Sequence, residues 1–147
     1  MRLEDSLVID CATDRLYEMV KDVERHSKLL PGYTESRIVE HGQRSCIVQR
    51  EAIMAGVRRR WKSEVWFDAR RTIHFRQVEG PLTGMHVQWI LVPEGPGTRM
   101  TIVHEVCVRP RWKGWWLERW VARPAIEQTA RLVLNAIKRH AEQEARS

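Results

Sequence analysis

The chain has 147 residues, of which 43% are hydrophobic and 30% charged, and its formal net charge is +6. This composition is typical of one globular domain spanning residues 1–147 and excludes a transmembrane helix, because no stretch approaches 18 consecutive apolar residues. The N-terminus resembles no targeting peptide and the three cysteines (Cys11, Cys46, Cys107) lie far apart, so we expect reduced thiols in the cytoplasm rather than disulfides or a zinc site.

The positive charge does not by itself indicate a nucleic-acid-binding protein. Twenty of the 25 basic residues are arginines, and they are scattered except at residues 58–60 and 109–123. No nucleic-acid-binding motif accompanies them, so we expect no nucleic-acid partner. A basic surface of this kind suits acidic partners in general, including acidic proteins and anionic lipid.

The first part of the chain is predicted to hold a strand followed by two short helices. Residues 6–11 alternate weakly between apolar and polar, as a strand would. After Thr13, which suits a helix N-cap, the residues Leu16, Met19 and Val20 fall at helical spacing. A second short helix, at about residues 24–30, is expected to end at Pro31.

From Tyr33 onward the pattern becomes one of strands rich in Val, Ile, Thr, Trp and Phe, separated by turn residues such as Gly42, Gly56 and Gly80. These connections are short, which favours antiparallel neighbours because a parallel crossover needs about a dozen residues. The predicted strands occupy residues 34–41, 44–54, 57–68, 71–79, 84–93 and 98–109.

An apolar stripe dominates the C-terminal end of the chain. From Pro124, a residue tolerated in a first helical turn, apolar residues recur at helical spacing and predict a helix of about 20 residues. One helix with one apolar face must pack on another surface, and the strands provide it. We therefore predict an α+β fold in which a curved antiparallel sheet of about seven strands wraps around a long C-terminal helix.

Strand alternation assigns one face of the sheet to the interior. The predicted inner face is mainly apolar and aromatic, with polar interruptions at Arg59, Gln77 and His104 and an additional candidate at Glu51. Two interpretations remain open for Arg59: an ion pair, for instance with Glu51, or a group that orients the oxygens of a ligand in a cavity. His104 is either a packed histidine or a proton acceptor. No metal-ligand cluster and no phosphate-binding loop occurs in the sequence, so we expect no metal and no cofactor.

Four tryptophans between residues 112 and 120 lie among five basic residues, and Trp112, Trp116 and Trp120 would share one helical face. This segment either packs on the rim of the sheet or forms an amphipathic element that touches a membrane or a partner.

Several short motifs together resemble a known family. These are Leu7-Val8-Ile9-Asp10, Leu30-Pro31-Gly32-Tyr33, Val78-Glu79-Gly80-Pro81-Leu82 and Gly97-Thr98-Arg99. They resemble the START-like (SRPBCC, Bet v 1-like) superfamily, in particular its polyketide cyclase/dehydrase and coenzyme Q-binding branch, over about residues 5–143. The resemblance implies the helix-grip fold, with a hydrophobic ligand held between the sheet and the C-terminal helix.

The resemblance also implies site residues. In the aromatase/cyclases of this branch a tyrosine after the second helix and arginines on the inner strands bind polyketide oxygens. Tyr33 matches the tyrosine, and Arg76 or Gln77 falls near one arginine. The other arginine position holds Val65 here, which puts the same chemistry in doubt, although Arg59 on the same face could replace it.

Two functions therefore remain open. The first is a polyketide cyclase/aromatase that performs aldol cyclisation and dehydration, with an acidic acyl carrier protein as partner and Tyr33, Arg59 and His104 as catalytic residues. The second is a non-catalytic carrier for a quinone or lipid, with peripheral membrane contact through Trp112–Trp120. In both cases the predicted ligand-binding residues are Trp61, Val65, Phe75, Arg76, Gln77, Val87, Trp89, Leu134 and Ile137.

Overall fold

The computed structural model describes residues 1–69, 71–106 and 123–146. Seven strands form one antiparallel sheet in the order β1-β7-β6-β5-β4-β3-β2. The strands are β1 (Arg2–Ile9), β2 (Tyr33–His41), β3 (Cys46–Met54), β4 (Val57–Asp68), β5 (Thr72–Glu79), β6 (His86–Glu94) and β7 (Gly97–Glu105). The helices are α1 (Thr13–Lys21), η1 (Val23–Arg25), α2 (His26–Leu29) and α4 (Arg123–Arg146).

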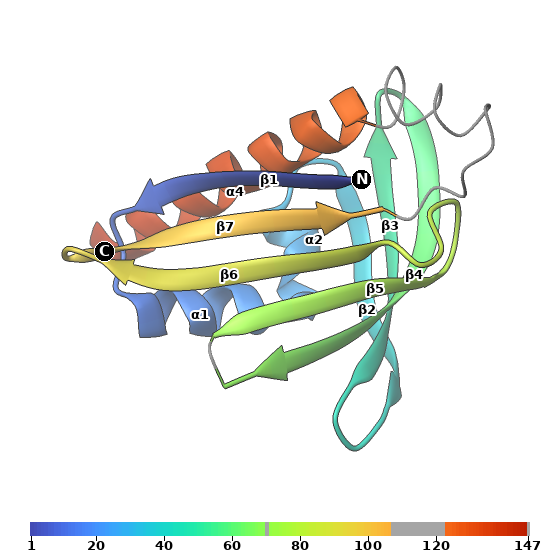
Figure 1. The fold of residues 1–147 in the computed structure, drawn as a ribbon, viewed down its shortest axis with the longest axis horizontal. Helices are drawn as coiled ribbons and strands as arrows, with labels where there is room; N and C mark the ends of the chain where they lie inside the picture. Colours follow the sequence, from blue (N-terminus) through green and yellow to red (C-terminus); the bar gives the residue numbers. More distant parts are fainter. Residues whose placement is uncertain (70, 107–122, 147) are drawn as a thin grey trace.

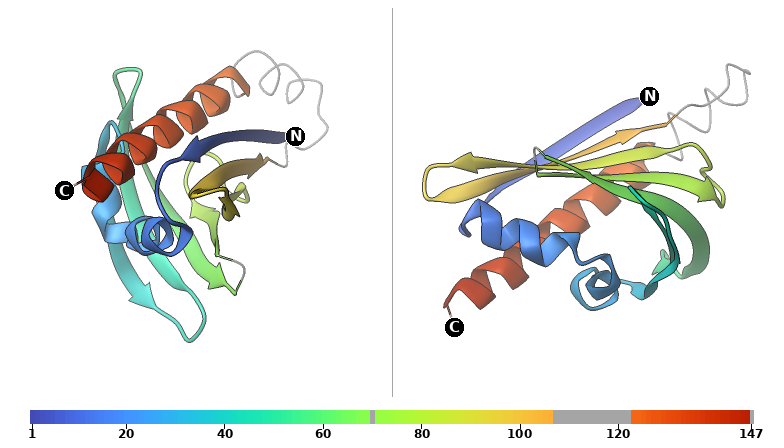
Figure 2. Two further views of the ribbon diagram at one scale, coloured as in Figure 1. Left: turned by 90° about the vertical axis from the view of Figure 1, so that its left-hand side faces the viewer. Right: turned by 90° about the horizontal axis from the view of Figure 1, so that it is seen from below.

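The described helices all cover the concave face of the sheet, as Figures 1 and 2 show. The long helix α4 packs mainly along β1, at one edge of the sheet. Helix α1 packs on β6 and β7, and α2 packs on β2, at the other edge. This confirms the predicted helix-grip fold, with its curved sheet of seven strands, its long C-terminal helix and its short helices between the first two strands. None of the described helices is both long and apolar enough to cross a bilayer.

The hydrophobic core lies between the concave face and the helices. The apolar stripe of α4 is buried there through residues such as Leu134 and Ile137, both 0% exposed. Facing strand residues such as Val65, Ile73 and Trp89 belong to the same cluster. Burial of this one continuous surface holds the helices on the sheet.

Two predicted strand boundaries differ from the structure by more than two residues. The first strand begins at Arg2 rather than at residue 6, because β1 pairs along its whole length with β7. The last strand ends at Glu105 rather than near residue 109. Residues 107–122, which include Cys107 and the predicted amphipathic segment Trp112–Trp120, lie outside the described residues.

Left-handed backbone conformations shape the two turns that lie next to β3. The two residues that join β3 to β4 are Ala55 (φ 51°) and Gly56 (φ 77°), as expected of a tight hairpin between right-twisted strands. Gly32 (φ 79°) precedes β2, and a Cβ atom added there would lie 2.6 Å from the backbone oxygen of Ile53. The backbone of Gly32 and Ile53 is also joined by a hydrogen bond of 2.8 Å, which fixes the start of β2 against β3.

Candidate functional site

A charged side chain is buried on the concave face at a position that the sequence analysis did not select. Arg50 of β3 is 3% exposed, and its Nη1 donates a hydrogen bond of 2.9 Å to Nδ1 of His26. The guanidinium lies over two aromatic rings, 4.9 Å from the ring centre of Tyr33 and 5.3 Å from that of Phe75. Among the residues that the structure describes, no carboxylate pairs with Arg50. We call Arg50, His26, Tyr33, Phe75 and Trp89 the arginine cluster.

His26 is held in a single tautomer by its two partners. Its Nε2 lies 2.7 Å from the backbone oxygen of Val20, which can only accept, so Nε2 carries the hydrogen. The unprotonated Nδ1 is therefore free to accept the hydrogen bond from Arg50. Burial and then the nearby positive charge of Arg50 lower the pKa of His26 to about 3, so the imidazole is neutral at physiological pH.

Aromatic rings enclose the guanidinium and the imidazole. His26 stacks on Trp89 with ring centres 5.0 Å apart, and Phe75 lies against the same indole at 5.0 Å. Tyr33 meets Trp61 edge to face at 5.8 Å. The short helix η1, which directly precedes His26, is tied to the sheet because the hydroxyl of Ser36, on β2, donates to the backbone oxygen of Val23 at 2.6 Å. The site thus combines flat apolar surfaces with one strong hydrogen-bond donor group.

The structure brings together most of the predicted ligand-binding residues. Val65, Phe75, Val87, Trp89, Leu134 and Ile137 are all buried in the core cluster, and Tyr33 packs against it. Gln77 is also buried, but its Oε1 already accepts the backbone N–H of Leu82 at 2.5 Å and so holds the following loop. Its placement favours a structural role for the amide oxygen.

Two predicted arginines lie elsewhere. Arg59 is exposed, as are all of the first four residues of β4, so no described helix covers the sheet here. Its predicted partner Glu51 pairs instead with Arg60 at 2.5 Å and Arg58 at 3.4 Å, since Glu51 stands opposite Arg60 in the β3–β4 register. Arg76 is exposed on the convex face, with its guanidinium 5.3 Å from the ring centre of Trp66. These positions do not support a ligand contact by either Arg59 or Arg76.

His104 is buried on β7 near the start of α4, at 8% exposure. Burial lowers its pKa to about 4, and among the described residues its Nδ1 has no hydrogen-bond partner. The side chain borders a hollow of about 300 Å³, whose walls include Leu3, Ile102 and Ile126. No contact joins His104 to Arg50 or Tyr33 among the described residues, so His104 forms a second polar point on the same concave face.

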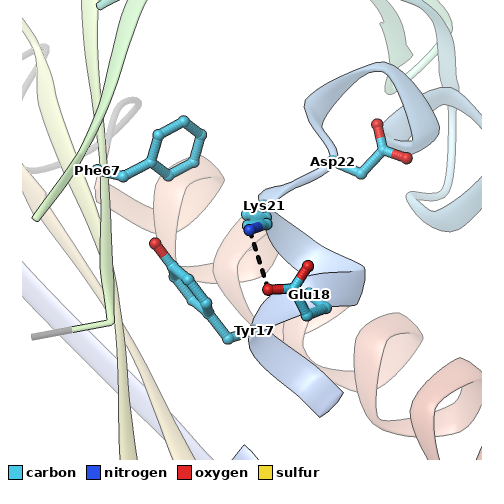
Figure 3. A pocket seen from close by; sticks show the side chains of 5 residues that line it. All are labelled: Tyr17, Glu18, Lys21, Asp22 and Phe67. Atoms are coloured by element: carbon cyan, nitrogen blue, oxygen red, sulfur yellow. Dashed lines mark ion pairs between the residues drawn. The ribbon is translucent and has the colours of Figure 1, made fainter. Parts of the chain in front are cut away.

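A larger hollow, of about 500 Å³, opens on the surface between α1 and the end of β4 (Figure 3). The rings of Tyr17 and Phe67 border it from the two elements, and Lys21 pairs with Glu18 at 2.9 Å beside them. Phe67 follows the inner-face alternation but is 43% exposed, because it borders this open hollow. None of the predicted site residues borders this hollow.

A polar chain on the convex face is a further feature that the sequence analysis missed. His74 Nε2 donates to the Asp68 carboxylate at 2.9 Å, and His74 Nδ1 lies 3.0 Å from Nε2 of His86. Trp66 stacks against both imidazoles. The alternation of the strands places these groups on the face opposite the arginine cluster. The described residues contain no group of three or more His, Cys, Asp or Glu side chains placed to hold a metal ion.

Comparison with known proteins agrees with this fold. A family model described as "Polyketide cyclase / dehydrase and lipid transport" matches residues 9–138. The chain is similar in structure to the Zhui aromatase/cyclase from Streptomyces sp. R1128, with 23% identity, a TM-score of 0.88 and coverage of 100% of this chain and 96% of that one. No curated protein sequence matches the chain.

Two further solved structures show the same fold. A START superfamily protein from Mycobacterium smegmatis is 15% identical, with a TM-score of 0.79 and coverage of 97% of both chains. The di-domain ARO/CYC BexL from the BE-7585A biosynthetic pathway is 20% identical, with a TM-score of 0.81; the match covers 97% of this chain and 50% of BexL. At these identities the structural likeness establishes the fold alone.

Proposed function

Because this chain belongs to the polyketide cyclase/dehydrase and lipid transport family, we propose that it binds a hydrophobic, oxygen-bearing small molecule on the concave face of the sheet and acts on it as an aromatase/cyclase. The observation that carries this proposal is the arginine cluster. A buried guanidinium has five N–H donors, and Arg50 uses one of them on His26. The absence of a carboxylate partner in the described part of the chain leaves donors for the oxygens of a ligand.

The aromatic rings define the class of ligand. A planar molecule that lies against Trp89, Phe75 and Tyr33 would gain apolar contact, while its carbonyl or phenolate oxygens would accept hydrogen bonds from Arg50. A poly-β-ketone and its aromatic products have both properties. If the substrate is tethered to an acidic acyl carrier protein, the net charge of +6 would favour the encounter.

The aldol step requires three events at the protein. A base removes a proton from a carbon between two carbonyls, the enolate carbon attacks another carbonyl, and the resulting alkoxide takes up a proton before water is lost. Arg50 and the hydroxyl of Tyr33 would stabilise the negative charge as it develops on oxygen. His104 is the proposed proton acceptor, because its imidazole is neutral and its buried Nδ1 has no hydrogen-bond partner among the described residues. Folding the flexible chain against the rings would supply the orientation.

One observation favours a carrier without catalysis as the second candidate. Val65, at the position where the family resemblance implies a binding arginine, is 0% exposed within the apolar core, and Arg59 is too far out on β4 to replace that arginine. A quinone or similar lipid would use the same rings and the same Arg50 donors. The two candidates differ in whether the oxygen contacts change the rate of a reaction.

The test compares Arg50→Gln with Arg76→Gln. Glutamine at position 50 keeps an N–H donor for His26 but removes the charge, so affinity for an oxygen-bearing aromatic ligand should fall about 10- to 100-fold, as expected for loss of a hydrogen bond to a charged group. Arg76→Gln, on the convex face, should leave the affinity unchanged. The measurement is fluorescence titration of the tryptophans. Wild-type affinity in folded Arg50→Gln would overturn the proposed site.

A second variant separates enzyme from carrier. Tyr33→Phe keeps the ring and removes one hydroxyl, so ligand affinity should change by no more than about 1.5 kcal/mol. If the hydroxyl stabilises an oxyanion, turnover of a poly-β-ketone should fall about 10²–10³-fold. Wild-type turnover indistinguishable from the reaction without protein, together with tight quinone binding, would leave only the carrier.

A further inference from the structure

The β3–β4 hairpin ends in an exposed apolar tip. Ile53 and Val57, next to the turn at Ala55 and Gly56, are 44% and 48% exposed. Figure 1 shows this tip at the same end of the molecule as the start of α4. Other aliphatic side chains of the described residues are as exposed, Val92 at 51% among them, but at this tip two of them lie beside a run of three arginines. This combination of apolar and basic side chains points to a contact outside the chain.

Positive charge surrounds this tip on both faces of the hairpin. Arg58, Arg59 and Arg60 follow Val57 directly, and all three are exposed. Alternation along β4 places Arg59 on one face and Arg58 and Arg60 on the other. Glu51 is the carboxylate that both Arg58 and Arg60 contact, so the three arginines retain a net positive charge.

We propose that this hairpin tip is a docking surface for an anionic lipid bilayer. Ile53 and Val57 enter the interfacial layer, and the guanidinium groups of Arg58, Arg59 and Arg60 bind lipid phosphates, as in other interfacial elements that combine apolar residues with basic ones. The arrangement favours lipid over an acidic protein. A protein partner covers one face of a hairpin, whereas headgroups surround an inserted tip on both faces, where the arginines are.

The position of the tip connects the bilayer to the arginine cluster. The inner face of β3 runs from Met54 at the tip through Ala52 to Arg50, a distance of about 13 Å at roughly 3.3 Å per residue. A hydrophobic molecule leaving the bilayer would follow this row to the guanidinium. This transfer of a ligand from the bilayer rests on the proposed function. The membrane contact does not rest on it, and membrane binding can be measured without any ligand.

The experiment is co-sedimentation of the protein with vesicles of phosphatidylcholine, with and without phosphatidylserine. Binding should require the anionic lipid and weaken with salt. Arg59→Gln should lower the partition coefficient about fivefold, and Ile53→Ser or Val57→Ser about tenfold each. Val57→Trp should increase it, because tryptophan favours the interface. Val92→Ser is the matched control: Val92 is 51% exposed at the far end of β6 and should have no effect.

Three results would overturn the proposal. The wild-type protein could fail to bind anionic vesicles. Folded Val57→Ser and Ile53→Ser could bind like wild type, while replacing Trp112, Trp116 and Trp120 by Ser abolishes binding, which would assign the contact to another segment. The hairpin variants could also lose binding to an acidic carrier protein while vesicle binding stays intact, which would assign the tip to a protein partner. Because every substituted side chain on the hairpin is exposed, circular dichroism of the variants should match that of the wild type.

Discussion

Mild acid should destabilise this protein at pH values where its carboxylates are still ionised, because two histidines are buried in the neutral form. Folding lowers the pKa of His26 from 6.5 to about 3, and that of His104 from 6.5 to about 4. The unfolded chain therefore takes up protons below pH 6.5 that the folded chain does not. The stability that the neutral imidazoles contribute is fully present above pH 6.5 and is lost as the pH falls towards 3–4.

The size of the effect follows from the width of this window. For each histidine, the free energy of unfolding falls by about 1.4 kcal/mol per pH unit over the range in which the imidazole is protonated in the unfolded chain but not in the folded one. We take the range from pH 6.5 down to 4.5, which is the usual pKa of a glutamate. Over this range His26 lowers the free energy of unfolding by about 2 kcal/mol, and His104 lowers it by about the same amount. The sum of about 4 kcal/mol is a large share of the 5–15 kcal/mol that stabilises a typical domain.

Urea unfolding at several pH values between about 4.5 and 7 measures this loss. His26→Gln removes one titrating group, so the slope of unfolding free energy against pH should fall by up to about 1.4 kcal/mol per pH unit, whatever the variant costs in stability. His104→Gln should have the same effect. A wild-type unfolding free energy that stays constant over this range would refute the reasoning.

Two further substitutions test the packing. Ile137→Asp should unfold the protein, because an unpaired charge at a 0% exposed position on α4 costs several kcal/mol, whereas Leu132→Asp on the 49% exposed side of the same helix should be tolerated; equal melting temperatures would contradict the gripping role of α4. Gly32→Ala should cost about 2 kcal/mol in chemical unfolding, because its φ of 79° and the backbone oxygen of Ile53 leave no place for a Cβ atom. Wild-type stability in this variant would show that the start of β2 can shift.

The fold could be predicted because its determinants are local. Alternation assigned Val65 and Trp89 to the concave face, and a helical stripe assigned Ile137 to the surface that packs on it; all three are buried. The first residues of β1 escaped prediction for an equally local reason. Arg2, Glu4 and Asp5 are charged, because one face of this edge strand is open to water. From the sequence alone, these residues therefore look like a polar segment before the first strand.

The arginine cluster could not be predicted because its parts come from different elements. His26 lies in a short helix and Arg50 in a strand, and only the tertiary fold places them 2.9 Å apart. Alternation through Val48 and Ala52 would have placed Arg50 on the inner face, whereas the sequence analysis considered its neighbour Glu51. For Arg59 the face of the strand was predicted correctly, but its burial was not. A period of two residues says which way a side chain points, not where the covering helices end.

The strand order also fixes when the sheet can close during synthesis. Each strand from β2 to β7 pairs with the next one along the chain, so these hairpins can form one after another as they emerge. β1 is made before the other strands but pairs with β7, from Ile9 opposite Thr98 to Arg2 opposite Glu105, so it must stay unpaired until β7 has been made. Such a distant pairing slows folding, because the entropy of closing the long loop is lost before the contacts form. The N-terminal strand is therefore the part of the nascent chain that depends longest on protection from other chains.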